Sequence, residues 1–351
     1  MKIVALDLGQ QKSVACIYET ATGLHRLMTV PSTPAALTAM FQQHAPQRVV
    51  IEIGPLAGWV ADVVRALGVE PQVAKTNEAA WQWKNVKRKT DRDDALKLAQ
   101  LSALNQIKPV HVPELKVRQW RGLIAGRHSL VGQQTAVKNR IRALLTAQGP
   151  SLLPTGDKAW SQAARETLQT LARPLAACGA EDLWRGELDL QLNLLAFLEK
   201  QVAAITAQLN DLAHQNKRVQ LVQTIPGVGP RLAETVVAIL DNPERFTSGK
   251  QVGSYAGLTP RQYQSGGTDR RGRISKHGHR LLRALLVEVS WAALRWNEWA
   301  RDTFRRVCRG SKTRRKIAIV AVARRLLVIC WAMLRDNKPW QGRARPVATA
   351  A

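Results

Sequence analysis

Short apolar strands alternate with helices along the first 75 residues, and this order restricts that region to the α/β class of folds. Strands are expected at five apolar runs: residues 2–8, 13–19, 24–30, 48–53 and 69–74. Helices are expected at 34–44, where Pro34 suits a helix start, and at 58–67. Three strands followed by alternating helices and strands are typical of the ribonuclease H-like arrangement.

The rest of the chain reads as mostly helical. Apolar steps of three and four residues predict long helices at 91–105, 114–148, 280–295 and 313–335. Residues 157–185 are also expected to be helical, although their periodicity is poor. The expected division is residues 1–150, 151–218 and 219–340, with a tail at 341–351.

A heptad seam occupies the middle segment, with Gln191 as its one polar interruption. Its members are Leu188, Leu195, Leu198, Val202, Ile205, Leu209 and Leu212. A self-associating coiled coil and an intramolecular helical hairpin both satisfy this pattern, and the sequence leaves both open.

The chain carries a formal net charge of +26, which points to a polyanionic partner. The basic residues are spread along the chain and mixed with Trp and Leu, as in folded nucleic-acid-binding proteins. The apolar stretch at 317–323 is cut by Arg324 and Arg325 and is too short to span a bilayer. No signal-peptide pattern precedes the first strand, so a cytoplasmic location without a membrane partner is expected. Four well-separated cysteines predict neither a disulfide framework nor a zinc site.

Four acidic residues stand out against this basic background: Asp7, Glu52, Asp91 and Asp94. Asp7 and Glu52 lie on predicted strands, and Asp91 and Asp94 are spaced to share one face at a helix start. Two Mg²⁺ ions about 4 Å apart neutralise both the attacking and the leaving oxygens at a phosphodiester, and they need such carboxylates. The acids at 91–94 also suit a helix N-terminus without metal, and Asp93 is a rival for Asp94.

The stretch at 261–278 is polar, rich in glycine and densely basic. Ser265 precedes two glycines, which allow a close approach to phosphate, but Ser254 and Ser275 are equally tempting as nucleophiles. The turn at 224–230 has a Gly-x-Gly pattern that suits either backbone binding of phosphate or a plain helix start. Candidate nucleic-acid contacts are Lys87, Arg88, Lys89, Arg121, Lys138, Arg140, Arg270, Arg271, Arg273 and Lys276.

Taken together, these motifs resemble the DEDD transposases of the insertion sequence 110 family. That family is related to Piv-type DNA invertases, and its members are also called bridge-RNA-guided recombinases. The resemblance rests on the four acids, with the run Lys-Thr-Asp-Arg-Asp-Asp-Ala at 89–95, on Ile-Pro-Gly-Val-Gly at 225–229, and on Gln-Ser-Gly at 264–266 followed by residues 272–278.

The resemblance implies a RuvC-like amino-terminal domain whose acids, Asp7, Glu52, Asp91 and Asp94, hold two Mg²⁺ ions. It implies a carboxy-terminal transposase domain in which Ser265 is the nucleophile. The two domains are expected to form one composite site, in which Ser265 forms a serine–phosphodiester intermediate. A noncoding bridge RNA is expected to pair with target and donor DNA, and the protein is expected to act as a dimer that becomes a tetramer on assembly.

The sequence leaves two other enzyme functions possible, a nuclease and a recombinase. A third alternative is a nucleic-acid-binding protein without catalytic activity. A metal-dependent Holliday-junction endonuclease would use the acids for hydrolysis and the basic stretch at 261–278 only for binding. A site-specific DNA invertase would act without a guide RNA. A protein that only binds nucleic acid gains nothing from acidic residues facing a polyanion, which argues against that class.

Overall fold

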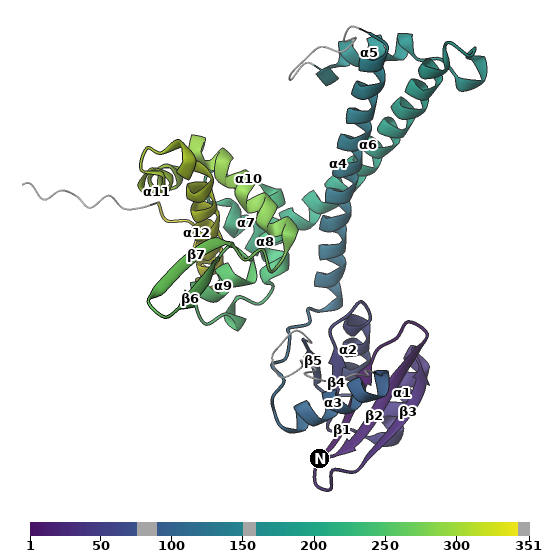
Figure 1. Ribbon diagram of the computed structural model, residues 1–351, viewed down its shortest axis with the longest axis vertical. Coiled ribbons are helices and arrows are strands. Elements are labelled where there is room, and N and C mark those ends of the chain that lie inside the picture. The colour runs from purple at the N-terminus through teal and green to yellow at the C-terminus, as the bar shows by residue number, and fades with distance from the viewer. Residues whose placement is uncertain (76–89, 150–158, 343–351) are drawn as a thin grey trace, which may run out of the picture. The chain divides into compact units, whose positions relative to one another are not determined.

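The computed structural model describes residues 1–75, 90–149 and 159–342, with the side chain of Arg271 also left undescribed. It contains two compact units, Met1–Gln119 and Trp120–Ala351 (Figure 1). Lys87, Arg88 and Lys89, which we expected to contact nucleic acid, lie outside the described residues.

A five-stranded sheet organises the first unit, in the order β3-β2-β1-β4-β5. Its strands are β1 (Lys2–Asp7), β2 (Lys12–Glu19), β3 (His25–Pro31), β4 (Arg48–Glu52) and β5 (Pro71–Ala74). β1, β2 and β3 pair antiparallel, whereas β1, β4 and β5 pair parallel. The five predicted strands are confirmed with small shifts at their ends.

Helices cover both faces of this sheet. α1 (Pro34–His44) and α2 (Ala57–Ala66) pack on the face that carries Val4, Leu6 and Ile51. α3 (Asp91–Ala103) packs on the opposite face, against Ile3, Ala5 and Val50. Because side chains alternate along a strand, residues of β1 and β4 with the parity of Ala5 and Val50 face α3.

Residues of the heptad seam are buried against another helix of the same chain. α4 (Leu115–Ala147) and α6 (Leu183–Gln215) run side by side (Figure 1), and Leu188, Leu195 and Leu198 of α6 are buried with Val137 and Ile141 of α4. This packing favours the helical hairpin over a self-associating coiled coil as the reason for the heptads.

The expectation of continuous helix over 157–185 is wrong in its second half. α5 (Gln162–Leu171) is helical, but the chain then turns extended at Ala172 and continues as a short 3₁₀ segment, η3 (Leu175–Ala177). Pro174 explains the break, because proline lacks the N–H that a continuing helix needs and disfavours helical backbone before it.

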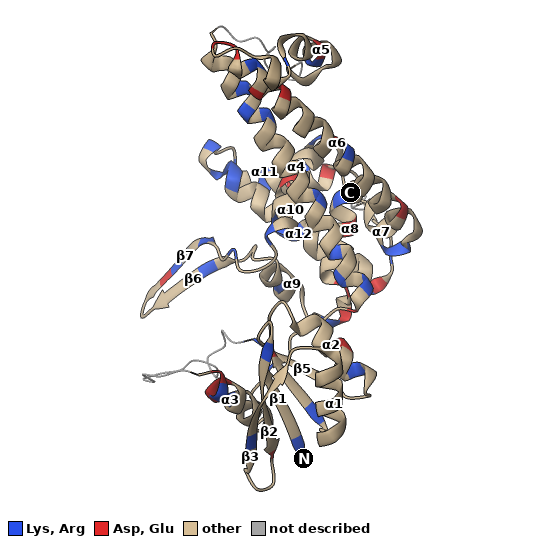
Figure 2. Cartoon of the chain, turned by 90° about the vertical axis from the view of Figure 1, so that its right-hand side faces the viewer, with Lys and Arg blue, Asp and Glu red and all other residues tan. Residues whose placement is uncertain are grey.

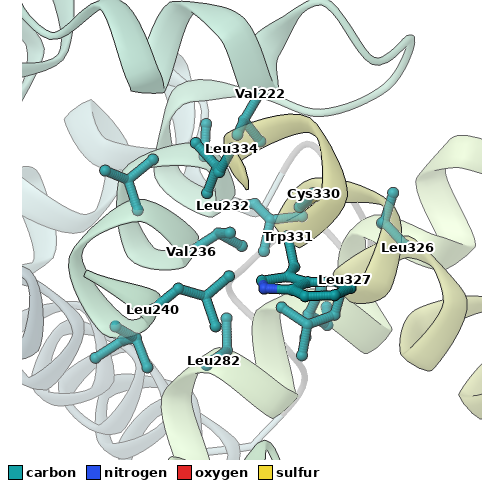
Figure 3. Packing of buried hydrophobic residues seen from close by; sticks show 14 of the residues in the cluster. Val222, Leu232, Val236, Leu240, Leu282, Leu326, Leu327, Cys330, Trp331 and Leu334 are labelled. Carbon is teal, nitrogen blue, oxygen red and sulfur yellow. The ribbon is translucent and has the colours of Figure 1, made fainter. Parts of the chain in front are cut away.

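The remaining helices of the second unit enclose a common core (Figure 3). They are α7 (Lys217–Gln223), α8 (Pro230–Leu240), α9 (Gly249–Tyr255), α10 (Arg280–Trp296), α11 (Glu298–Cys308) and α12 (Arg315–Asp336). Leu327, Cys330 and Trp331 of α12 pack against Val236 and Leu240 of α8. The Trp331 Nε1–H donates to the Pro243 carbonyl oxygen at 2.8 Å, which satisfies the polar end of a buried ring.

α12 with its preceding turn, Lys312–Asp336, is long and apolar enough by length and composition to span a bilayer. A single such helix is weak evidence for a membrane span, and 56% of its most apolar window is buried inside the structure, so the expectation of no membrane partner is consistent with it. Most of the buried residues of α12 belong to the largest hydrophobic cluster of the second unit, as expected of a central helix in a globular domain. The four cysteines are free thiols, and burial raises the pKa of Cys16 to about 11.

Candidate active site

Asp7 and Glu52 lie at the carboxyl ends of two neighbouring parallel strands. The β1–β4 register pairs Leu6 with Ile51, so Asp7 and Glu52 follow one residue later on each strand. Both have the parity of Ala5 and Val50, which places the two side chains on the α3 face of the sheet. The prediction that Asp7 and Glu52 lie on strands is confirmed, and the structure adds that these two strands are neighbours.

The direction of α3 brings its acidic first turn to the same end of the sheet. Near its carboxyl end, the Ser102 carbonyl oxygen accepts from Arg48 Nη1 at 2.9 Å, and the Ser102 hydroxyl donates to Gln72 Oε1 at 2.6 Å. Arg48 and Gln72 lie at the amino ends of β4 and β5, so α3 runs antiparallel to these strands. Its amino end therefore points to the edge where Asp7 and Glu52 lie.

Two acids of the first turn of α3 are in different surroundings. Asp94 is only 6% exposed and neighbours Ala95 and Leu98 on the face that packs against the sheet. Asp91 is exposed at the first position of the helix. The positive amino end of the helix favours negative charge at both positions.

Asp93, the rival of Asp94, has a structural task. Its backbone N–H donates to the Thr90 hydroxyl at 3.3 Å, and that hydroxyl donates to Asp93 Oδ2 at 2.6 Å. The Thr90 side chain is therefore the N-cap of α3 and satisfies an otherwise unpaired N–H at the helix start, while Asp93 accepts a hydrogen bond from the capping hydroxyl. Asp93 is exposed and faces away from the sheet, which favours Asp94 as the inward-facing acid.

The acids fit a hard cation by their chemistry. Mg²⁺ takes oxygen ligands and is commonly held by one or two carboxylates together with water and substrate phosphate. Asp7, Glu52 and Asp94 offer carboxylates from rigid elements at one sheet edge. Within residues 1–75, 90–149 and 159–342, no three His, Cys, Asp or Glu side chains are close enough to hold one ion. Convergence of four carboxylates on metal therefore stays a prediction.

Ser265 lies at the tip of a two-stranded ribbon, β6 (Pro260–Ser265) and β7 (Thr268–Ile274), which we call the serine ribbon (Figures 1 and 2). Ser265 pairs with Thr268 across the two-residue turn Gly266-Gly267. The polar stretch at 261–278, which in sequence is typical of a loop, contains a β-hairpin instead. A Gly-Gly pair between strands is a known hairpin signal, but both strands are polar and lack the apolar alternation by which strands are recognised.

The tip of the serine ribbon presents its hydroxyl to solvent. Every residue of β6 is exposed, and in the described part of the chain the Ser265 hydroxyl has no hydrogen-bonded base. Ser275, by contrast, lies at the foot of the ribbon, where its N–H donates to the Thr259 carbonyl oxygen at 2.8 Å. A nucleophile delivered to a separate site is expected at a tip rather than at a foot, which favours Ser265 over Ser275.

The histidine that follows the ribbon is used structurally. His279 Nδ1 accepts from the Leu282 N–H at 3.3 Å and so caps the start of α10. Burial lowers the pKa of His279, and the guanidinium groups of Arg121 and Arg283 lower it further. The imidazole is therefore neutral at physiological pH, as its role as an acceptor requires.

The foot of the ribbon depends on a close backbone crossing at Gly257. This residue follows α9 with φ +70°, and a Cβ there would lie 2.3 Å from the His277 carbonyl oxygen. The Gly257 carbonyl oxygen also accepts from the Lys276 N–H at 3.1 Å. The chain can pass here only because residue 257 has no side chain.

Gly257→Ala is expected to lower the free energy of unfolding by about 3 kcal/mol or more, because a new Cβ would collide with backbone in a left-handed conformation. Strand-exchange activity should fall with it as the ribbon shifts. Gly310→Ala is the matched control, with φ +73° and open space around the new Cβ, and should cost only about 1 kcal/mol. Denaturant unfolding compares the two, and equal losses would contradict the crossing as the cause.

Some of the basic residues predicted to contact nucleic acid already have partners within the protein, and others are exposed. Arg121 donates from Nε and Nη2 to the Ala238 and Ile239 carbonyl oxygens at 2.7 and 3.1 Å, closing the end of α8. Lys138 Nζ lies 3.9 Å from Glu199 Oε1. The exposed candidates are Arg140 on α4 and, on or beside the ribbon, Arg270, Arg273 and Lys276. Figure 2 shows basic residues, in blue, along the serine ribbon. Arg271 pairs with Gln262 in the ribbon, and its side chain is not described.

The Gly-x-Gly turn before α8 has a packing role. Gly227 has φ +88°, and a Cβ there would lie 3.1 Å from Ala293 Cα on α10. Asn297 Nδ2 donates to the Pro226 carbonyl oxygen at 3.3 Å. A tight turn at the start of a helix therefore explains why residue 227 is glycine, and no bound phosphate is needed to explain it.

Comparison with known proteins gives two family matches. A family described as "Transposase IS116/IS110/IS902 family" matches residues 219–305, and a DEDD transposase family of the IS110 group matches residues 4–150. The first match spans the serine ribbon, and the second spans all four acids.

Several curated relatives are similar over much of their length. A probable family 20 transposase of Pseudomonas aeruginosa is 28% identical over 86% of this chain and 87% of its own length. The transposase for insertion sequence element IS1111A of Coxiella burnetii is 29% identical over 72% and 68%, respectively. A pilin gene-inverting protein of Moraxella lacunata is 34% identical over 38% of this chain and 42% of its own.

Proposed function

The chain belongs to the IS110 family of DNA transposases, and on that premise we propose that it exchanges DNA strands through a covalent bond between Ser265 and a DNA phosphate. The acids Asp7, Glu52, Asp91 and Asp94 form the other half of this composite site. The guide in this proposal is a noncoding bridge RNA that pairs with target and donor DNA.

One observation supports the proposal: the candidate acids lie in the first compact unit and the candidate serine lies in the second. The second unit exposes a hydroxyl at the tip of the serine ribbon, and the ribbon offers it no hydrogen-bonded base. The first unit gathers carboxylates at one sheet edge. A serine hydroxyl needs activation to attack phosphorus, and the acids need a nucleophile for strand transfer rather than hydrolysis. Joining the two halves, within one chain or between subunits, satisfies both needs.

The proposed reaction conserves phosphodiester bonds. The Ser265 oxygen forms a bond to phosphorus while the bond from phosphorus to a deoxyribose oxygen breaks. The serine proton passes to an acceptor, and the departing deoxyribose oxygen takes up a proton. A hydroxyl from another DNA strand then attacks the phosphoserine, which restores Ser265 and joins the exchanged strands. No external energy source is required.

The proposed role of the acids is to hold two Mg²⁺ ions, which supply charge neutralisation at the attacking and leaving oxygens. The strand order β3-β2-β1-β4-β5, with α3 over the acidic edge, supports a RuvC-like fold for the first unit. In functional terms we propose a division into 1–150, 151–218 and 219–340, followed by the tail.

The proposed partners follow from charge and site geometry. Exposed Arg140, Arg270, Arg273 and Lys276 suit phosphates of DNA or RNA. A homo-oligomer, a dimer that becomes a tetramer on assembly, would bring several serine ribbons and acidic edges to one pair of DNA molecules. The cytoplasm, where both nucleic acids are found, is the proposed location.

Removal of divalent cations tests the acidic half directly. The full chain, with any copurifying RNA retained, is incubated with DNA carrying the element ends. EDTA is expected to reduce strand exchange by about 10³-fold, because bound metal contributes several kcal/mol to phosphoryl transfer. Adding excess Mg²⁺ should restore exchange. Undiminished exchange in EDTA would refute the metal-bearing half of the proposal.

The same assay separates the alternative functions. A Holliday-junction endonuclease would release free cleaved ends without a covalent protein–DNA adduct on a denaturing gel. An invertase acting without a guide would form the adduct but retain no discrete noncoding RNA when the copurifying nucleic acid is sequenced. The relative that inverts a pilin gene supports keeping this second alternative.

A further inference from the structure

A cationic cavity lies at the foot of the serine ribbon, between α9, α11 and α12. Its volume is about 490 Å³, within the range of small-ligand sites in proteins. Lys250, Arg306, Arg324 and Arg325 line it, and among the described residues no acidic side chain does. Trp299 forms part of the wall. A basic lining with one aromatic ring in its wall suits the two parts of a nucleotide, a phosphate and a flat base.

Two cations of the cavity, Arg306 and Arg324, are the candidates for binding an external anion. Within the described part of the chain, no carboxylate forms an ion pair with Arg306 or Arg324. A Cβ at Gly253 would lie 3.2 Å from Arg324 Cγ, so the stem of Arg324 lies along α9 and supports its guanidinium at the cavity. Arginine presents planar donors that match phosphate oxygens.

The Trp299 ring is held in place. It meets Trp340 edge-on, with ring centroids 5.9 Å apart and an interplanar angle of 74°. Trp299 and Ile329 also line a second cavity of about 350 Å³. Because Trp299 lines both cavities and contacts Trp340, its ring offers a positioned aromatic surface on which an unstacked base can lie.

From this geometry we propose that the cavity binds one splayed-out nucleotide of a single strand, with its phosphate on Arg306 and Arg324 and its base on Trp299. The proposal deepens the proposed function and rests on it, because the strand is one that the transposase handles. Thr259 lines the cavity and accepts from Ser275 N–H at the ribbon foot. β6 then runs to Ser265, about 20 Å away. A nucleotide held here would anchor a strand close to the serine ribbon.

Matched variants of the full chain test the arginine part. Arg306→Gln is expected to weaken binding of a single-stranded oligonucleotide by about fivefold or more and to reduce the salt slope by about 0.7. Arg305→Gln, its neighbour on α11, removes the same charge outside the cavity and should change affinity by less than about twofold. Oligonucleotides of one sequence, made as DNA and as RNA, show which strand the cavity takes. Equal affinities for the two variants on both strands would overturn the proposal.

Photocrosslinking tests the base contact on the unmodified protein, so that no variant needs to fold. Oligonucleotides carrying 5-iodouracil are irradiated in the complex, and the crosslinked residue is identified by mass spectrometry. Crosslinking to Trp299 is expected, whereas crosslinking only to the exposed Trp296 would overturn the proposal. The serine adduct is measured in parallel. An intact adduct with no Trp299 crosslink refutes the cavity alone, and a Trp299 crosslink with no adduct refutes the serine mechanism alone.

Discussion

Ser265→Ala is expected to abolish the covalent protein–DNA adduct and to lower strand exchange by at least about 10³-fold, because the substitution removes the attacking oxygen. The fold should be unaffected. Ser265 is exposed at the ribbon tip, and surface substitutions of this kind usually change stability by about 0.5 kcal/mol or less. The measurement is a denaturing gel of the protein incubated with labelled DNA and Mg²⁺, together with a strand-exchange assay.

Ser254→Ala and Ser275→Ala are the controls, since the sequence offers both serines as rivals. Ser254 is exposed on α9, and Ser275 lies at the ribbon foot. Both variants should keep the adduct. An adduct that persists in Ser265→Ala, or that disappears only in Ser275→Ala, would show that the nucleophile was misassigned.

Asp94→Asn is expected to lower strand exchange by about 10²-fold or more while DNA binding is retained. The substitution keeps the shape of the side chain and removes its charge, so it weakens a hard-cation site without opening a cavity. Asp94 is 6% exposed on the sheet-facing side of α3, where Asp7 and Glu52 also face. The measurement compares strand exchange over a range of Mg²⁺ concentrations, and a partial rescue at high Mg²⁺ is expected.

Asp93→Asn is a closely matched control, one residue away in the same helical turn. Its carboxylate accepts a hydrogen bond from the hydroxyl of Thr90, the N-cap residue of α3. Loss of that charge should cost about 1 kcal/mol of stability and leave strand exchange near its normal rate. If Asp93→Asn is inactive and Asp94→Asn is active, the metal-binding role belongs to the capping residue and our assignment is wrong.

Much of the first unit was predictable because its signals are local. Apolar runs separated by glycine and proline predict the five strands, and Pro34 after Thr33 predicts the start of α1. Asp7 and Glu52 were found on strands for the same reason. The three-residue spacing of Asp91 and Asp94 also predicted correctly that both lie in the first turn of one helix.

Patterns of neighbouring residues did not predict secondary structure in segments that have no buried face. The serine ribbon is exposed along all of β6, so its strands lack apolar alternation and resemble a loop in sequence. α11 was also missed, because its apolar residues are few and the chain bends at Asn297, which caps the helix through the Ala300 N–H. A turn signal was available in Gly266-Gly267, but by itself it does not distinguish a hairpin from a flexible loop.

The sequence by itself determined the five strands of the first unit, the long helices and the acids that these strands and helices carry, since these depend on neighbours a few residues away. Only the tertiary structure decided that β1 pairs with β4, that α3 runs back along them, that the α6 heptads face α4, and that Trp299 shares a cavity with Arg306 and Arg324. The physical reason is that these features depend on contacts between residues far apart in the chain. Burial of apolar surface selects such contacts for the whole unit at once, and no short window of sequence contains them.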